Sequence, residues 1–132
     1  MLIDTHSHLY LSQFDADRDE MLKRAKDAGI HKILLPNIDI ESIAGMNAMA
    51  DKNPDLCYPM MGLHPCDVKP DFESLLEKIR MEFNTRKYIA VGEIGMDMYW
   101  DKTTLDIQQK AFRIQVQWAK ELQLPIVIHA RD

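Results

Sequence analysis

Short apolar runs alternate with longer amphipathic stretches along the chain, and this alternation restricts the possible fold more than any other feature. The apolar runs predict strands at residues 2–3, 32–36, 58–62, 88–92 and 125–128. The stretches between them have helical spacing: one follows the acidic residues 15–20 and stops at Gly29, and the others cover residues 41–51, 72–83 and 104–123. Strands that alternate with helices favour right-handed βαβ units around a parallel sheet, so we expect an α/β fold.

No linker, internal repeat or low-complexity segment divides the sequence, which predicts a single domain over residues 1–132. The near-continuous apolarity of the third to fifth runs indicates strands buried on both faces. The fifth strand is expected to reach His129, and the chain stops at Asp132 with no helix to cover that strand. The pattern therefore predicts an incomplete set of βα units.

Composition excludes several classes of protein. With 46% hydrophobic and 28% charged residues, the chain has ordinary globular composition. A net charge of −5 gives no general attraction for nucleic acid, so any phosphate binding must be local. No apolar run approaches the roughly 20 residues that span a bilayer, and no export signal opens the chain, so we expect a cytoplasmic protein without membrane contact. Its two cysteines, Cys57 and Cys66, are expected to be reduced thiols.

Polar residues that could carry chemistry follow the predicted strands at their carboxyl ends. In parallel α/β folds this edge is where ligands bind, because loops from several strands converge there. These candidates are His6, His8, Asn37, Asp39, His64, Glu93, Asp97, His129 and Arg131. His31 precedes a strand and is expected on the surface at the opposite edge.

His6 and His8 are two residues apart, so in extended backbone both imidazoles project to the same face and can reach one metal ion. Taken singly, each candidate has an ordinary alternative: a chance pair for His6 and His8, a structural ion pair for Glu93, and a hydrogen bond to a backbone carbonyl for His129. Together, imidazoles and a carboxylate from three strand ends suit zinc, manganese, cobalt or nickel. The combination favours one metal site over unrelated roles.

Four segments, in this order, resemble the TatD family of metal-dependent hydrolases: Ile-Asp-Thr-His-Ser-His-Leu, Gly-Leu-His-Pro, Val-Gly-Glu-Ile-Gly-Met-Asp and Leu-Pro-Ile-Val-Ile-His-Ala-Arg-Asp. The resemblance covers essentially all 132 residues. It implies a TIM-type barrel of the amidohydrolase kind, a centre with two divalent metal ions, and deoxyribonuclease activity, that is, phosphodiester hydrolysis. The metal, which could also be magnesium, is not specified.

By the same resemblance, His6, His8 and Glu93 would bind one ion, and Glu93 and His129 the second. Glu93 would bridge the ions as the catalytic carboxylate. The substrate, a nucleic acid or another phosphoester, would lie near a second group of residues that do not bind metal. That group is His64, Asp97 and Arg131, with the Tyr99–Trp100 pair beside them. Trp100 stands where the family motif is expected to have a basic residue.

The length differs from that of a complete barrel, which has eight strands and roughly 250 residues. The resemblance implies further ligands, a histidine after the sixth strand and an aspartate after the eighth, that have no counterparts here. Five strands leave open edges, so we expect self-association through the open face or derivation from a longer protein, with weakened metal binding and impaired turnover. Two alternatives stay open: another amidohydrolase-type metallohydrolase, and a non-catalytic half-barrel that acts as an assembly module.

Overall fold

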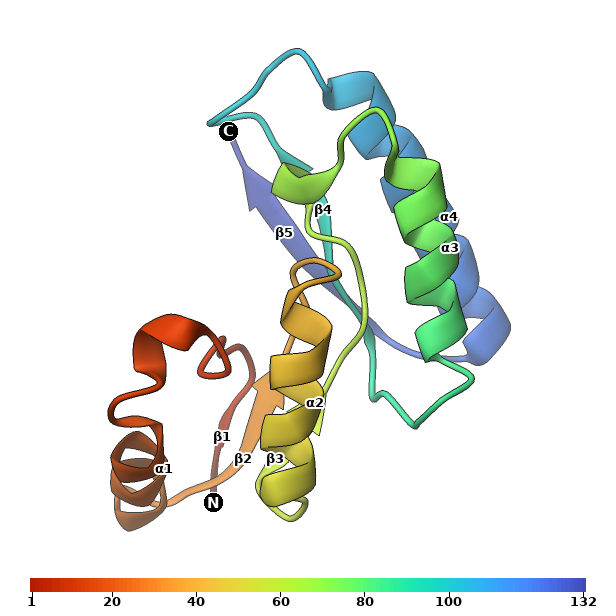
Figure 1. Ribbon diagram of the computed structural model, residues 1–132. Coiled ribbons are helices and arrows are strands. Elements are labelled where there is room, and N and C mark those ends of the chain that lie inside the picture. Colours follow the sequence, from red (N-terminus) through yellow and green to blue (C-terminus); the bar gives the residue numbers. More distant parts are fainter.

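Strands and helices alternate from one end of the chain to the other in the computed structural model, which describes residues 1–132 (Figure 1). The order is β1 (Leu2–Asp4), α1 (Arg18–Asp27), β2 (Ile30–Leu35), α2 (Ser42–Lys52), β3 (Cys57–Pro59), α3 (Phe72–Glu82), β4 (Val91–Asp97), α4 (Leu105–Leu122) and β5 (Ile126–Arg131). Two short 3-10 helices, η1 (Ser12–Phe14) and η2 (Pro65–Asp67), follow β1 and β3. None of the helices combines the length and the apolarity that crossing a membrane requires.

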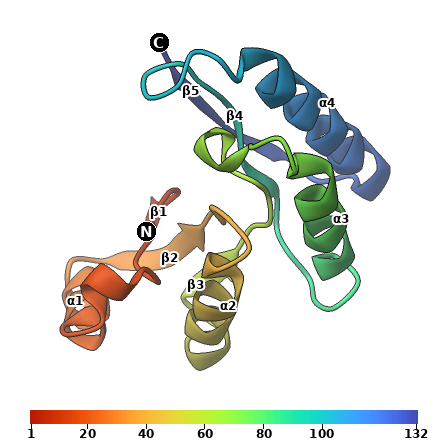
Figure 2. The ribbon, with the colours of Figure 1, turned by 45° about the horizontal axis from the view of Figure 1, so that its top comes forward.

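All strand pairs are parallel, as the sequence predicts. They form a sheet in the order β1–β2–β3 and a second pair, β4–β5. A parallel bridge between Met61 and Val91 joins the two, because the Met61 amide donates to the Ala90 carbonyl (3.2 Å) and the Gly92 amide donates to the Met61 carbonyl (3.0 Å). Figure 2 shows α1 and α2 beside β1–β3, and α3 and α4 beside β4 and β5. The carboxyl ends of the strands therefore face the same edge, where the candidate residues lie.

Helix α4 is fixed to the strands through two buried glutamines as well as through apolar packing. Gln115 accepts a hydrogen bond from the Leu63 amide (2.8 Å) and donates to the Leu63 carbonyl (3.3 Å). Gln108 holds the backbone of Asp97 in the same way, at 2.8 and 3.0 Å. Residues seven apart lie on one helix face, so both amides act from the same side of α4. They fix the backbone next to His64 and the end of β4.

The fourth strand differs from its predicted position. It begins at Val91 and continues to Asp97, so Glu93 and Asp97 lie within the strand and not beyond it. The Gly-Glu-Ile-Gly segment is typical of a loop. Here it continues the strand, because glycines without a Cβ allow β5 to pack close to the β4 backbone. Gly95 has a φ of +146°, and a Cβ placed on it would lie 2.0 Å from the His129 carbonyl oxygen. His129 likewise lies inside β5 and not after it.

The expectation that β5 is buried on both faces is wrong. Ile126 and Ile128 are exposed, because β5 pairs with β4 alone and no helix packs over it. The strands β3 and β4 are mostly buried, as predicted. The end of α1 also agrees with prediction: the helix stops at Asp27, and Gly29 has a φ of +85°, the left-handed conformation typical of a helix C-terminus.

Candidate metal centre

Imidazoles from the two ends of the chain converge on one carboxylate at the carboxyl edge of the strands. His6 and His8 lie just after β1, Glu93 lies in β4, and His129 lies in β5. The Glu93 side chain is 6% exposed, whereas His6 is 40% exposed, so the centre opens to solvent on the β1 side. Four residues predicted to share a site are thus brought together from opposite ends of the sequence.

On the first side of the carboxylate, three atoms form a tight triangle. The Nε2 atoms of His6 and His8 are 3.2 Å apart, and they lie 3.1 and 3.3 Å from Oε2 of Glu93. Ligands of one ion at about 2.1 Å, with angles near 90–110°, are separated by roughly 3.0–3.4 Å. The spacing of these three atoms therefore fits a divalent cation.

On the second side, Oε1 of Glu93 lies 3.0 Å from Nδ1 of His129 and 3.9 Å from Nε2 of His64. The two imidazole nitrogens are 3.3 Å apart. Each carboxylate oxygen thus has its own group of imidazole nitrogens, and both groups are compact enough to hold a metal ion. Glu93 is the one residue that belongs to both groups.

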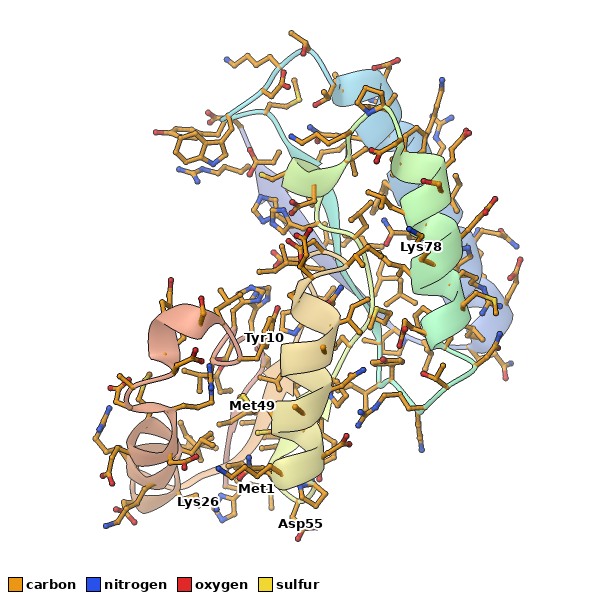
Figure 3. The ribbon with its side chains drawn as sticks, in the orientation of Figure 1. Met1, Tyr10, Lys26, Met49, Asp55 and Lys78 are labelled. Atoms are coloured by element: carbon orange, nitrogen blue, oxygen red, sulfur yellow. The ribbon has the colours of Figure 1, made fainter.

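Tyr10 determines which nitrogen of His8 is free to bind a cation. The Tyr10 hydroxyl, which lies between the segment after β1 and α2 (Figure 3), donates its hydrogen to the Pro36 carbonyl. It can therefore only accept from Nδ1 of His8, 2.8 Å away, so that nitrogen carries a proton. In neutral His8 the Nε2 atom is then a bare lone pair facing the Glu93 oxygen, and a cation between these two acceptors relieves their repulsion.

Asp97 has the corresponding effect on His129. Its Oδ2 lies 2.7 Å from Nε2 of His129, and burial of the Asp97 carboxyl is outweighed by hydrogen bonds that hold its pKa below the usual range. An ionised Asp97 requires the proton of neutral His129 on Nε2, which leaves Nδ1 as the lone pair directed at Glu93. Asp97 thus contacts a candidate ligand directly, as an outer partner.

His64 has the opposite orientation. The backbone amide of Cys66 donates to Nδ1 of His64 (3.1 Å), and burial lowers the pKa of the imidazole, so the neutral ring carries its proton on Nε2. That N–H points toward His129 and Glu93 as a donor. In this tautomer Nε2 of His64 has no free lone pair for a metal ion, although it lies in the same compact group as Glu93 and His129. That His64 lines the site without binding metal stays a prediction.

The electrostatic setting of Glu93 favours a cation. Burial by itself would raise the pKa of this carboxyl, but the hydrogen bond to His8 and the positive charges of the surrounding imidazoles outweigh it and lower the pKa to about 2. The carboxylate is therefore stabilised by positive charge on both sides. A metal ion between the carboxylate and the imidazoles would supply positive charge at the same place.

The remaining predicted residues have different surroundings. Asn37 is fully buried and donates to the carbonyls of Asp39 and Gly62 (both 2.9 Å), so it shapes the loop after β2. Asp39 accepts from the amide of Ser42, the first residue of α2 (2.8 Å). His31 is exposed at the start of β2, at the opposite edge, as expected. The side chains of Asn37, Asp39 and His31 make no hydrogen bond to the Glu93 carboxylate. The Asn37 backbone does hold the strand there, because its carbonyl accepts from the Glu93 amide and its amide donates to the Gly92 carbonyl (both 3.2 Å).

Arg131 makes no ion pair with Asp97 or Asp132 and instead places its guanidinium 3.7 Å from the ring centre of Tyr99. Both cysteines are free thiols, as predicted. Asp4 accepts a hydrogen bond from the His6 amide (3.1 Å), which orients the turn after β1.

Sequence reasoning missed Tyr10, Gln108 and Gln115. Tyr10 has the same two-residue spacing from His8 that His8 has from His6, so the periodicity of an extended segment was a usable signal. The glutamines gave no such signal, because their partners are backbone groups more than ten residues away.

Removing the Tyr10 hydroxyl should weaken metal binding. In Tyr10→Phe, nothing holds the proton on Nδ1 of His8, and loss of such outer partners lowers metal affinity by about 10- to 100-fold. Calorimetric titration with Mn²⁺ or Zn²⁺ measures this, and nitrogen-15 NMR of His8 reports the tautomer directly. Tyr58→Phe, which removes a hydroxyl bonded to Lys32, is the matched control. Equal affinity in the Tyr10 variant and the control would contradict the assigned role.

Comparison with known proteins gives a consistent result. Residues 3–132 match the family model for TatD related DNase. The chain is 39% identical, over its full length, to the uncharacterized metal-dependent hydrolase YabD of Bacillus subtilis, and 31% identical over 131 residues to the 3'-5' ssDNA/RNA exonuclease TatD of Pectobacterium parmentieri. The crystal structure of the TatD homolog YjjV from Escherichia coli superposes with a TM-score of 0.89 at 34% identity, covering 98% of this chain and 51% of that one. The chain spans about half the length of the curated relatives it matches.

Proposed function

Because the chain belongs to the family of TatD related DNases, we propose that it carries the metal centre of a metal-dependent hydrolase that cleaves phosphodiester bonds in nucleic acid. The observation that carries this proposal is the division of the Glu93 carboxylate between two groups of imidazoles, one on each oxygen. A carboxylate shared in this way suits two ions held side by side, which is the arrangement used by many phosphodiesterases.

We infer that His6, His8 and Glu93 hold one ion and that Glu93 and His129 hold the other. Bound divalent cations supply Lewis acidity there: they lower the pKa of a water molecule and neutralise charge on the phosphodiester. The residues around them have separate tasks. Tyr10 and Asp97 orient the two imidazoles, and Glu93 keeps its negative charge between them.

His64 is suited to contact the substrate. Its Nε2–H is held toward the centre by the Cys66 amide at Nδ1, and a neutral donor there can bind a non-bridging phosphate oxygen. Arg131 lies two residues after His129 on β5, so both side chains project from the same face of the strand. Its guanidinium has no carboxylate partner and can pair with a neighbouring phosphate.

The substrate and the completeness of the site are part of the proposal. A nucleic acid is favoured by the Pectobacterium relative, which is named as a single-stranded DNA and RNA exonuclease. Residues 1–132 would form one part of a barrel domain, and the expected weak metal binding and impaired turnover of this chain stay predictions. Self-association also stays a prediction; the exposed Leu2, Ile3 and Ile128 on the two edge strands are the surfaces that would be covered.

Two alternatives make different predictions. A non-catalytic assembly module needs no metal, whereas the pairs of acceptors facing each other at Glu93 favour one. A metallohydrolase for cyclic amides would leave phosphodiesters uncut. A panel of single-stranded DNA, RNA and a cyclic amide, each assayed with Mg²⁺, Mn²⁺ or Zn²⁺ and with a chelator, separates the three.

Chelator-sensitive release of nucleotides from the nucleic acids is the expected result, at a low rate because the incomplete barrel impairs turnover. Cleavage that survives removal of the metal, or metal-dependent turnover confined to the cyclic amide, would overturn the proposal.

A further inference from the structure

Next to the metal centre, the loop after β4 presents two aromatic side chains to solvent. Trp100 is 73% exposed and Tyr99 is 49% exposed, whereas the other tryptophan of the chain, Trp118, is 8% exposed and belongs to the core. Large aromatic side chains are costly to leave in water, and an exposed pair at the rim of a polar site is typical of a binding surface.

Arg131 joins the two rings into one surface. Its guanidinium carbon lies 3.7 Å from the Tyr99 ring centre and 5.8 Å from that of Trp100, and the two rings meet edge to face with centres 4.8 Å apart. A guanidinium stacked in this way is held in place by the ring, while its N–H donors at the edge stay free. The surface therefore combines aromatic faces with a positive charge that no acid of this chain neutralises.

This surface is coupled to the metal centre through Asp97. One oxygen of Asp97 accepts from the Tyr99 amide (3.0 Å), and the other contacts His129 (2.7 Å). Asp97 and Trp100 also line a common cavity of about 250 Å³, with Lys69 at its wall. Along β5, Arg131 is one two-residue repeat from His129, about 6.6 Å. The aromatic surface therefore lies next to the place where a phosphodiester would be cut.

We propose that Tyr99, Trp100 and Arg131 form a stacking platform for an unpaired base of a nucleic acid strand whose phosphodiester lies at the Glu93 centre. This inference rests on the proposed function and adds a feature of the substrate to it. An unpaired base offers its ring face to Trp100, and the adjoining phosphate meets Arg131. A base within a duplex has both faces covered by its neighbours, so the platform selects single strands. The protein has a net charge of −5, so this local contact matters more than any general attraction to phosphate.

The test measures binding without cleavage. With a chelator present to prevent turnover, a single-stranded oligothymidylate is titrated into the 132-residue protein, and the tryptophan fluorescence is followed. Stacking on Trp100 should quench its emission, while the buried Trp118 keeps its own. The same length of abasic sugar-phosphate strand and a DNA duplex are the comparison ligands.

Three variants define the role of the ring. Stacking of one base on an aromatic side chain corresponds to a loss of about 5- to 150-fold in affinity on replacement by alanine, so Trp100→Ala should bind the oligothymidylate that much more weakly. Trp100→Phe keeps a ring and should retain most of the affinity. Met81→Ala removes another exposed apolar side chain, on α3, and should bind like the unchanged protein.

Equal affinity of Trp100→Ala and the unchanged protein would overturn the platform, as would equal affinity of the unchanged protein for the abasic strand and the oligothymidylate. So would duplex binding that is as tight as single-strand binding. These results leave the proposed function intact if chelator-sensitive cleavage is present. Quenching by single strands together with metal-dependent turnover confined to the cyclic amide would overturn the proposed function and support the platform as a binding site.

Discussion

Glu93→Gln should abolish metal binding at both sides of the centre while leaving the metal-free fold intact. The replacement has the same shape, but it has no negative charge, and one of its two terminal atoms becomes a donor. In the protein without metal this change is harmless, because an amide N–H can donate to the free nitrogen of His8 or His129. For a cation the change removes the one ligand that both groups share.

The expected magnitude exceeds that of an outer-partner substitution, which is about 10- to 100-fold in metal affinity. Metal present at a hundred times its dissociation constant stabilises a folded protein by about 2.7 kcal/mol. A variant whose affinity falls at least 100-fold retains at most about 0.4 kcal/mol of that stabilisation at the same concentration. Thermal unfolding with and without Mn²⁺ or Zn²⁺ therefore reads out the loss without any assay of turnover.

Two further variants make the result specific. Glu77→Gln removes an exposed carboxylate on α3 and should keep the full metal-dependent stabilisation. His129→Ala removes a ligand from one side alone, so the His6–His8 side should still bind and elemental analysis should find about half the metal. If Glu93→Gln bound metal as tightly as Glu77→Gln, the shared carboxylate would not be the centre of the site.

The sequence predicts the order of elements and the main ligands for a simple physical reason. Burying one face of a strand or helix requires apolar residues with a period of two or 3.6 residues. This period can be seen within each element's own short segment of sequence. The spacing of His6 and His8 is a local signal of this kind. Their convergence with His129 could be expected because parallel strands all end at the same edge of the sheet.

The rest depends on contacts between distant backbone groups, which leave little trace in the sequence. The glycines beside Glu93 are typical of a loop, so the fourth strand was expected to end at the first of them, Gly92. Only the approach of β5 to Gly95 reveals why the strand continues. The exposure of β5 could not be predicted for a similar reason. An apolar run indicates a buried strand whether or not a neighbouring element covers it. The tautomer of His64 depends on one backbone amide, that of Cys66, which no residue pattern identifies.

Among the glycine-to-alanine substitutions of this chain, Gly95→Ala should lower the free energy of unfolding most. The new Cβ would lie 2.0 Å from the carbonyl oxygen of His129 and 3.0 Å from its carbonyl carbon, and these are backbone atoms that cannot rotate away. The φ of +146° is also one that side chains with a Cβ rarely adopt. Strain from overpacking is about 1–3 kcal/mol, and an unfavourable backbone conformation adds about 1–3 kcal/mol.

A combined loss of about 2–6 kcal/mol is a large part of the roughly 5–15 kcal/mol that stabilises a typical domain. Alanine substitutions at two other glycines, measured by urea unfolding, separate the contribution of overpacking from that of the backbone conformation. Gly29 has a positive φ but nothing within 4 Å of a built Cβ, so Gly29→Ala should cost only the conformational part, about 1–2 kcal/mol.

Gly45 lies inside α2 with ordinary contacts, and Gly45→Ala should stabilise the protein by about 0.5–1 kcal/mol. Because the added methyl at Gly95 pushes β5 from β4, it should also displace His129 from Glu93, so the metal-dependent stabilisation should fall together with the stability. A Gly95→Ala protein as stable as Gly29→Ala would mean that β5 does not pack against this strand as closely as described, and that the second group of ligands is not held by the sheet.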